Sequence, residues 1–421
     1  MTVYTGCLSR SYNRKADWER EAEGGLSVKK KAGKTRPQKT LILNKPVIAV
    51  TGSAGKTTTK EMIFAILNRR MSTYRSMYNK NFLGNTRAHV KRLRDEHEAA
   101  VLEFGILRSG HIQQHCRIIQ PNMGVITNIG TAHIGNFEGK AGRLAMAKSE
   151  LIRNMKPTGT VFINRDCPYS RRFAGQPFRG SFAGRFVTFG IEQEADYRAE
   201  HIVMEADGIS FVCQIGQQSE AFFIPTLGGH NVYNALAAIA VAHTLGIPLA
   251  DIRQGLRQFQ PQKKRLVCYR LNNNVQVLDD TYSSNPDAAK AAIDVLSQSE
   301  HGTKVAVLAS MLEMGKYEVQ GHEEVGQYLS SKNVDYLYTF GSSARHIARA
   351  AIRAGFPAER VMHCANKEVL HRSLAKRVKP DTTILVKGSH KLKMGETVEF
   401  LRKVTAGSKL PRRKLPNRKQ A

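Results

Sequence analysis

The hydrophobic positions of the chain form short β-branched runs that alternate with stretches of helical spacing. Val47-Ile48-Ala49-Val50 predicts a buried strand, and apolar residues between Thr58 and Arg70 recur at helical spacing. Strands are also predicted over 99–104, 124–129 and 161–164, with a helix over 142–154. Strands that alternate with helices indicate a mostly parallel sheet covered by helices.

The pattern then changes twice. Short runs at 186–189, 209–215 and 221–224 predict antiparallel strands appended to the sheet, and 231–245 predicts a helix. After a polar stretch at 260–265, a second alternation begins, with strands predicted at 275–278, 305–308, 336–340 and 384–386 and helices at 287–298, 320–331, 343–353 and 366–378. We therefore predict four parts: a basic, disordered segment 1–45, a central domain 46–262, a C-terminal domain 263–405 and a basic tail 406–421.

The net charge of +29 in 421 residues is unusually high and extends beyond the ends of the chain. Residues 1–45 contribute +7 and residues 409–421 contribute +6, so the remainder carries +16. Such a field favours an acidic substrate, nucleic acid or an anionic membrane surface. No apolar run approaches the roughly 20 residues that span a bilayer. Met1–Arg20 lacks the apolar stretch of a signal peptide, so we expect a cytoplasmic protein.

The segment Thr51-Gly52-Ser53-Ala54-Gly55-Lys56-Thr57-Thr58 lies between the first strand and the first helix, the context of a phosphate-binding loop. Val50 stands where the strict pattern has its first glycine. Gly52 and Gly55 still allow backbone N–H groups to surround phosphate oxygens, Lys56 can reach the β- and γ-phosphates, and Thr57 offers a hydroxyl to Mg²⁺. The fold class is therefore α/β: a P-loop parallel-sheet ATPase domain with appended antiparallel strands, followed by a smaller Rossmann-like α/β domain.

The sequence of this loop resembles the ATP-binding loop of the Mur ligase family, whose members join amino acids or peptides to a carboxylate during peptidoglycan assembly. Five further blocks, in order, are similar to that family: Thr127-Asn128-Ile129-Gly130 with Ala132-His133 and Ala147-Lys148-Ser149-Glu150; Gly229-His230-Asn231 with Asn234; Asp279-Asp280 with Tyr282 and Asn285; Met311-Leu312-Glu313-Met314-Gly315 with His322; and Val386-Lys387-Gly388-Ser389. The last three are most similar to the family's D-alanyl-D-alanine-adding member. The resemblance covers about 46–402.

The resemblance implies a role for each block. It makes Thr57 and Glu103 ligands of Mg²⁺ and His133 a ligand of a second Mg²⁺. It makes Lys148 a lysine that CO₂ carbamylates into a metal ligand. It further implies nucleotide contacts from Asn231, Asn234, Arg265 and Asp280, with Lys387 and Ser389 near the incoming amine. Each residue also has an alternative without a catalytic role. Glu103 would be an ordinary carboxylate at a strand end, His133 a solvated loop histidine and Lys148 a surface lysine. Asn231 and Asn234 would cap a helix.

Three departures from the family leave the substrate open. Only about 45 basic residues precede the first strand, where the family has a domain that holds the UDP of its substrate. Ala309-Ser310 replaces a glycine–acid pair, and His111 replaces an acid after a glycine. The loop 78–86 is only weakly similar in sequence to the family's asparagine-rich loop.

We therefore expect an ATP- and Mg²⁺-dependent ligase that joins an acidic carboxylate substrate to an amino acid or peptide amine through an acyl phosphate, without the UDP-binding domain. In a second form of this hypothesis, a partner protein supplies the substrate contacts of the UDP-binding domain, or the amine. The alternative is a nucleotide-responsive binding protein on the same scaffold, whose basic tails hold nucleic acid or an anionic membrane. We favour it less, because the basic residues show no interleaved stacking aromatics.

Overall fold

The computed structural model describes residues 39–175, 178–300 and 302–406, and these form two compact units. The first comprises the described residues up to Gln262 together with Glu313–Glu318, and the second comprises Lys263–Leu312 and the described residues from Val319 onwards. Residues 407–421 of the predicted tail 406–421 and residues 1–38 of the predicted segment 1–45 lie outside the described residues. Within 39–45, Leu41 forms an isolated parallel bridge with Ile119.

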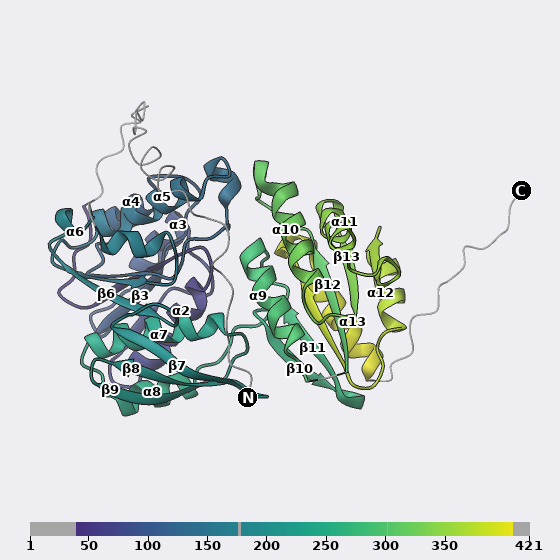
Figure 1. Cartoon of the computed structure of the whole chain (residues 1–421). Coiled ribbons are helices and arrows are strands. Elements are labelled where there is room, and N and C mark those ends of the chain that lie inside the picture. Colours follow the sequence, from purple (N-terminus) through teal and green to yellow (C-terminus); the bar gives the residue numbers. More distant parts are fainter. Residues whose placement is uncertain (1–38, 176–177, 301, 407–421) are drawn as a thin grey trace, which may run out of the picture. The chain divides into compact units, whose positions relative to one another are not determined.

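The described part of the first unit contains a nine-stranded sheet in the order β2-β3-β1-β4-β5-β6-β7-β8-β9 (Figure 1). The strands are β1 (Val47–Thr51), β2 (Thr73–Arg75), β3 (Ala99–Glu103), β4 (Met123–Ile126), β5 (Thr160–Asn164), β6 (Arg185–Gly190), β7 (Tyr197–Met204), β8 (Ile209–Ile215) and β9 (Gln218–Ile224). The helices are α2 (Lys56–Leu67), α3 (Leu83–Val90), α4 (His111–Ile118), α5 (Ala141–Asn154), α6 (Phe178–Ser181), α7 (His230–Thr244) and α8 (Leu249–Arg257).

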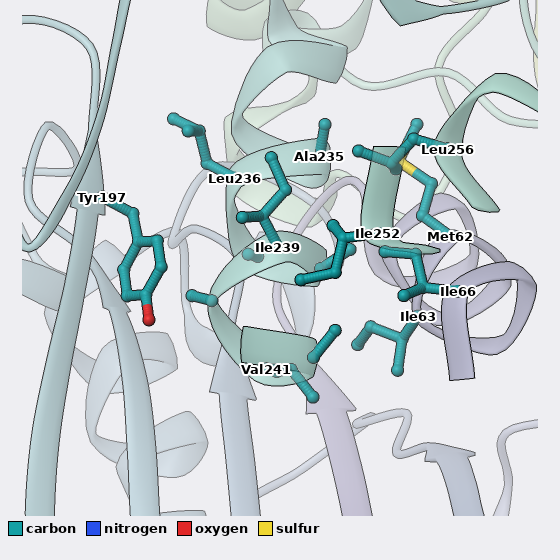
Figure 2. Close-up of a cluster of buried hydrophobic side chains, with 14 of the residues drawn as sticks. Met62, Ile63, Ile66, Tyr197, Ala235, Leu236, Ile239, Val241, Ile252 and Leu256 are labelled. Atoms are coloured by element: carbon teal, nitrogen blue, oxygen red, sulfur yellow. The ribbon is translucent and has the colours of Figure 1, made fainter. Parts of the chain in front are cut away.

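Period-two alternation along the central strands divides the apolar side chains between two cores. Ile48 and Val50 of β1 face the core built with α2, α7 and α8, whereas Val47 and Ala49 face the core that includes α4 and α5. Helices therefore cover both faces, which explains why these strands read as continuous apolar runs. Figure 2 shows Met62 and Ile66 of α2 directed towards α7 and α8.

The direction of one predicted strand is corrected by the structure. The run 186–189 was expected to belong to the antiparallel group, but β6 pairs parallel with β5 through Ile163 and Thr188. β7, which the apolar pattern did not reveal, pairs parallel with β6. The antiparallel pairs in the described sheet are β7–β8 and β8–β9. The fold class of this unit, a parallel sheet with appended antiparallel strands, is confirmed.

The described part of the second unit holds a six-stranded sheet in the order β10-β11-β15-β12-β13-β14, parallel except for the edge pair β10–β11. Its strands are β10 (Val267–Leu271), β11 (Val275–Asp280), β12 (Thr303–Ala309), β13 (Tyr336–Phe340), β14 (Val361–Cys364) and β15 (Thr382–Lys387). Its helices are α9 (Pro286–Ser297), α10 (Glu318–Ser330), α11 (Arg345–Arg353), α12 (Lys367–Ala375) and α13 (Gly395–Thr405). The expected smaller α/β domain is confirmed.

The parallel strands of the first unit position its chemistry. Thr51 ends β1, Glu103 ends β3 and Asn164 ends β5, so all three lie at the carboxyl edge of the sheet. The β1–β3 register sets Val50 opposite Glu103, one residue before the phosphate loop begins. Ligands of open α/β sheets bind at this edge.

Candidate active site

The phosphate loop occupies the turn between β1 and α2. Gly52 has φ +150° and Gly55 has φ +80°, a left-handed backbone that glycine adopts readily. Gly55 is also the N-cap of α2, and no side chain of the described residues caps that helix. The first turn of α2 contains no acidic residue, so its N-terminal N–H groups and positive dipole end can serve an anion.

Both glycines are also required by what packs against them. A Cβ at Gly52 would lie 1.8 Å from Thr127 Oγ1, and one at Gly55 would lie 2.1 Å from Asn234 Oδ1. Asn128 Oδ1 accepts hydrogen bonds from Ser53 N at 3.1 Å and from Ala54 N at 2.8 Å. The segment after β4 and helix α7 therefore hold the loop in shape from two sides.

Lys56 lies back over the loop, since its Nζ donates to Gly52 O at 2.9 Å. Thr57 Oγ1 donates to Glu103 Oε2 at 2.8 Å, and Glu103 is 2% exposed. The predicted Mg²⁺ pair, Thr57 and Glu103, is thus brought together. Mg²⁺ prefers oxygen ligands and is commonly held by one or two carboxylates together with substrate phosphates. These two residues fit such an ion.

His133 adopts a left-handed conformation with φ 60°, and its Nδ1 lies 2.6 Å from Oε2 of Glu313, which is also left-handed at φ 65°. Strained backbone of this kind is concentrated at functional sites. A carboxylate on one ring nitrogen directs the other nitrogen towards a ligand, as in metal-binding histidines. Burial lowers the pKa of His133 and the cation of Lys56 lowers it further, while Glu313 opposes the shift. A neutral imidazole, the form that binds metals, is favoured.

Lys148 lies on α5 and is 1% exposed. Burial lowers the pKa of its ammonium well below the usual value, and the cation of Lys56 adds to the effect. Within the part of the chain that the structure describes, no carboxylate forms an ion pair with Lys148. Burial therefore excludes the alternative that Lys148 is an ordinary surface lysine. Its neutral amine is the form that can react with CO₂.

A conventional metal cage is absent from residues 39–175, 178–300 and 302–406: no three His, Cys, Asp or Glu side chains group closely enough to hold an ion. The candidate donors are instead the hydroxyl of Thr57 and the carboxylate of Glu103, which contact each other. The imidazole of His133 and the amine of Lys148 are further candidates, and the Lys56 cation acts electrostatically on both. Such a set needs oxygens from elsewhere, which a nucleotide phosphate and a carbamate on Lys148 would provide.

Asn231 and Asn234 are buried at the start of α7, but neither is its N-cap, which is Gly229. Asn234 Oδ1 accepts from Thr59 Oγ1 at 3.1 Å, and its Nδ2 donates to Asn231 Oδ1 at 2.8 Å. Asn231 Nδ2 donates to Leu227 O at 2.7 Å. The capping interpretation is therefore wrong, and the structure places Asn234 against the phosphate loop.

The predicted residues of the second unit lie at the carboxyl edge of its own sheet. Asp280 ends β11 opposite Lys387, which ends β15, and Lys387 Nζ lies 2.6 Å from Asp280 Oδ2. The guanidinium of Arg265 lies over the ring of Tyr282, 4.2 Å from its centre. Asn285 accepts a hydrogen bond from Ala288 N at 3.0 Å and caps α9.

Family models match both units. The Mur ligase middle domain matches residues 50–242, and the Mur ligase glutamate ligase domain matches residues 264–390. The chain belongs to the Mur ligase family. This Mur ligase is therefore an ATP-dependent enzyme that uses Mg²⁺ and forms peptide bonds, and the comparisons favour this activity over the nucleotide-responsive binding protein. None of the helices in the described part is both long and apolar enough to cross a membrane.

The Mur ligase is similar to several enzymes that add D-alanyl-D-alanine. It is 33% identical to the UDP-N-acetylmuramoyl-tripeptide–D-alanyl-D-alanine ligase of Bacillus subtilis over 356 residues, 84% of this chain and 75% of that one. The Escherichia coli ligase of the same name is 31% identical, over 84% of this chain and 76% of that one.

Two crystal structures of such ligases resemble the fold. MurF from Acinetobacter baumannii superposes with a TM-score of 0.77 at 32% identity, covering 85% of this chain and 76% of that one. MurF from Thermotoga maritima in complex with ADP gives a TM-score of 0.74 at 25% identity, covering 87% of this chain and 81% of that one.

Several residues of the site were not singled out from the sequence. Asn128 and Glu313 lie inside the blocks that carry the family resemblance, which was the available signal. Asn81 donates to Glu103 Oε1 at 2.7 Å. Lys60 is fully buried and contacts the segment between β2 and α3 that contains Asn81. For Asn81 the only signal was the weak asparagine-rich pattern of 78–86, and for Lys60 there was none, since its carbonyl partners Ser76 and Tyr78 are distant in sequence.

Proposed function

We propose that the chain joins the amine of a D-alanyl-D-alanine-type dipeptide to the carboxylate of a UDP-linked muramyl tripeptide, and so serves peptidoglycan assembly. The observation that carries the proposal is the match to ligases of this name, at 30–33% identity over both units. The Thr57–Glu103 pair beside the phosphate loop supports it, because this pair would hold Mg²⁺. An acyl-phosphate route needs such a cation to stabilise the charge at the γ-phosphate.

The loop residues from Gly52 to Thr58 would hold the phosphates of ATP, with Lys56 balancing their charge. Mg²⁺ bound there would polarise the γ-phosphate and shield the charge on the attacking carboxylate. Thr57 and Glu103 would hold that ion. Thr127 and Asn128 hold the loop closed around its glycines. Preorganisation of this kind lets the loop stabilise developing charge without rearranging during the reaction.

Lys148 and His133 would hold a second Mg²⁺. Because burial favours the neutral amine of Lys148, its nitrogen can attack CO₂, form an N–C bond and release one proton, which leaves an anionic carbamate. An anionic oxygen ligand then stands where a buried neutral amine stood. Glu313 supports His133 by fixing its ring through Nδ1.

The assignments in the second unit extend the proposal. Arg265 would contact a phosphate, Asp280 the ribose, and Lys387 the incoming amine; the family-model match over 264–390 supports these roles. We also propose domains of 46–262 and 263–405, supported by the division of the described residues at Gln262. A cytoplasmic location is supported by five described cysteines that are free thiols.

The test uses the full chain with ATP, Mg²⁺, UDP-N-acetylmuramoyl tripeptide and D-alanyl-D-alanine. We expect ADP release only when both substrates are present, with a product whose mass equals the sum of the two less one water. Lys56→Ala should abolish release. A second arm replaces the UDP-linked substrate with the free tripeptide and shows whether this chain needs the UDP moiety. ADP release that is independent of either substrate would overturn the proposal.

A further inference from the structure

Lys60 of α2 is a buried cation that the proposed mechanism does not use. Its side chain is fully buried, and its Nζ lies 2.7 Å from Ser76 O, 2.5 Å from Tyr78 O and 2.9 Å from Glu61 Oε1. An ammonium has three donors, so these three acceptors can satisfy it completely. A charge is costly to bury, and removing one partner of a buried charge leaves the other uncompensated.

The two carbonyls belong to the segment between β2 and α3, residues 76–82, which we call the carboxylate loop. Tyr78 in this loop has φ 49°, a left-handed conformation that is uncommon for a side chain of its size. Its carbonyl points inward to Lys60 while its side chain is 64% exposed. The contact with Lys60 is therefore made by a residue whose backbone is strained.

The carboxylate loop also holds Glu103. Ser76 Oγ accepts from Glu103 N at 3.0 Å, and Asn81 Nδ2 donates to Glu103 Oε1 at 2.7 Å. Asn81 O also accepts from Gly105 N at 2.9 Å. A Cβ on Gly105 would lie 2.6 Å from Asn81 Oδ1, so the glycine leaves room for this approach. Glu103 thus has Thr57 on one oxygen and Asn81 on the other.

Helix periodicity links Lys60 to the residues around Glu103. Thr57 and Lys60 are three residues apart on α2 and therefore share a face. The opposite face carries Met62 and Ile66, which pack towards α7 and α8 (Figure 2). One rigid helix thereby carries the hydroxyl beside Glu103 and the cation that anchors the carboxylate loop.

We propose that Lys60 is a positioning residue for metal binding: through the carboxylate loop and Asn81 it fixes the orientation of the Glu103 carboxylate. The inference rests on the proposed role of Glu103 as a Mg²⁺ ligand. Residues that orient metal ligands typically change metal affinity or activity by about 10- to 100-fold when removed. Lys60 acts through the loop and touches neither ATP nor substrate in this account.

The test compares Lys60→Met, Asn81→Ala and Glu103→Gln in the full chain. The first readout is Mn²⁺ affinity, measured by calorimetry in the presence of a non-hydrolysable ATP analogue. The second is the Mg²⁺ half-saturation of ADP release, with kcat and the KM for ATP measured at saturating Mg²⁺. Lys304→Met is the matched control, since Lys304 is a buried lysine of the second unit whose Nζ contacts Ser297 O.

We expect Lys60→Met and Asn81→Ala each to weaken Mn²⁺ binding and lower kcat by about 10-fold or more, while the KM for ATP changes less than about threefold. Their double variant should be little worse than either single variant, because both act on Glu103. Lys304→Met should lower stability and leave metal affinity unchanged.

The outcomes separate this inference from the proposed function. If Glu103→Gln loses metal affinity while Asn81→Ala and folded Lys60→Met retain it, the positioning role is wrong and the metal site stands. If Glu103→Gln itself keeps the affinity of the unmodified chain, the metal assignment fails and the inference fails with it. Should Lys60→Met not fold, Asn81→Ala decides alone: unchanged Mn²⁺ affinity in that variant overturns the proposal.

Discussion

The packing of Asn234 against the phosphate loop predicts the cost of adding one methyl group at Gly55. In Gly55→Ala the new Cβ would lie 2.1 Å from Asn234 Oδ1 and 3.0 Å from its Cγ, so the amide must withdraw. Asn234 is held by Thr59 Oγ1 and by Asn231 Oδ1. The substitution therefore breaks two buried hydrogen bonds as well as straining the backbone.

The magnitude follows from these contributions. Alanine in a left-handed conformation costs about 1–2 kcal/mol. Each lost buried hydrogen bond costs about 1 kcal/mol, so Gly55→Ala should destabilise the first unit by about 3–4 kcal/mol. Asn234→Ala should cost about 2 kcal/mol through the same two bonds. Because those bonds are lost only once, the double variant should be about 2 kcal/mol less destabilised than the sum of the singles.

Equilibrium chemical unfolding of the three variants measures this coupling, and calorimetric titration with ADP reports the state of the loop. Gly216→Ala is the matched control: Gly216 also has positive φ, +61°, but nothing lies within 4 Å of its added Cβ. It should show only the backbone cost of about 1–2 kcal/mol. Additive effects of Gly55→Ala and Asn234→Ala, or equal costs at Gly55 and Gly216, would refute the packing argument.

Three other substitutions test separate features. Lys148→Met removes a buried amine that has no carboxylate partner among the described residues, so the melting temperature should hold or rise. Ligation should fall by at least about 100-fold, and retained ligation would exclude a metal role. Burial lowers the pKa of His115 from 6.5 to about 4, so the folded chain binds fewer protons than the unfolded chain and loses stability as pH falls from about 6.5 towards 4. His115→Gln should flatten the fall of the unfolding midpoint between pH 7 and 5, and an unchanged slope would show that His115 contributes nothing to it. Lys387→Met leaves Asp280 without its cation and should destabilise the second unit by about 3 kcal/mol in chemical unfolding, against no change for the exposed Lys391→Met; equal costs would contradict a stabilising pair.

The central strands of both units were predictable because both their faces are buried. In β1 and β3 every residue is buried, which produces an apolar run that periodicity detects. β7 escaped detection because it alternates buried residues with exposed or charged ones, as in Tyr197-Arg198-Ala199-Glu200. The parallel direction of β6 was missed because direction depends on the crossover between strands, which apolar spacing does not encode.

The site was predictable where its residues follow strands or form local motifs. Glu103 ends β3, and Thr57 lies in the first turn of α2, after the loop that follows the adjacent strand β1, so both lie at the carboxyl edge of the sheet. The contacts of Lys60 and Asn234 could not be predicted, since they depend on how distant segments pack around α2. Spacing along one helix predicts which residues share a face, but not which loop or helix that face meets.

The most direct test of amide formation through an acyl phosphate follows the oxygen of the substrate carboxylate. In this route the carboxylate attacks the γ-phosphate, and the amine later displaces phosphate, which leaves with one oxygen of the original carboxylate. With an ¹⁸O-labelled carboxylate substrate, mass spectrometry should find one ¹⁸O atom transferred to inorganic phosphate for each amide bond formed. Phosphate free of ¹⁸O, released while the amide forms, would contradict the account.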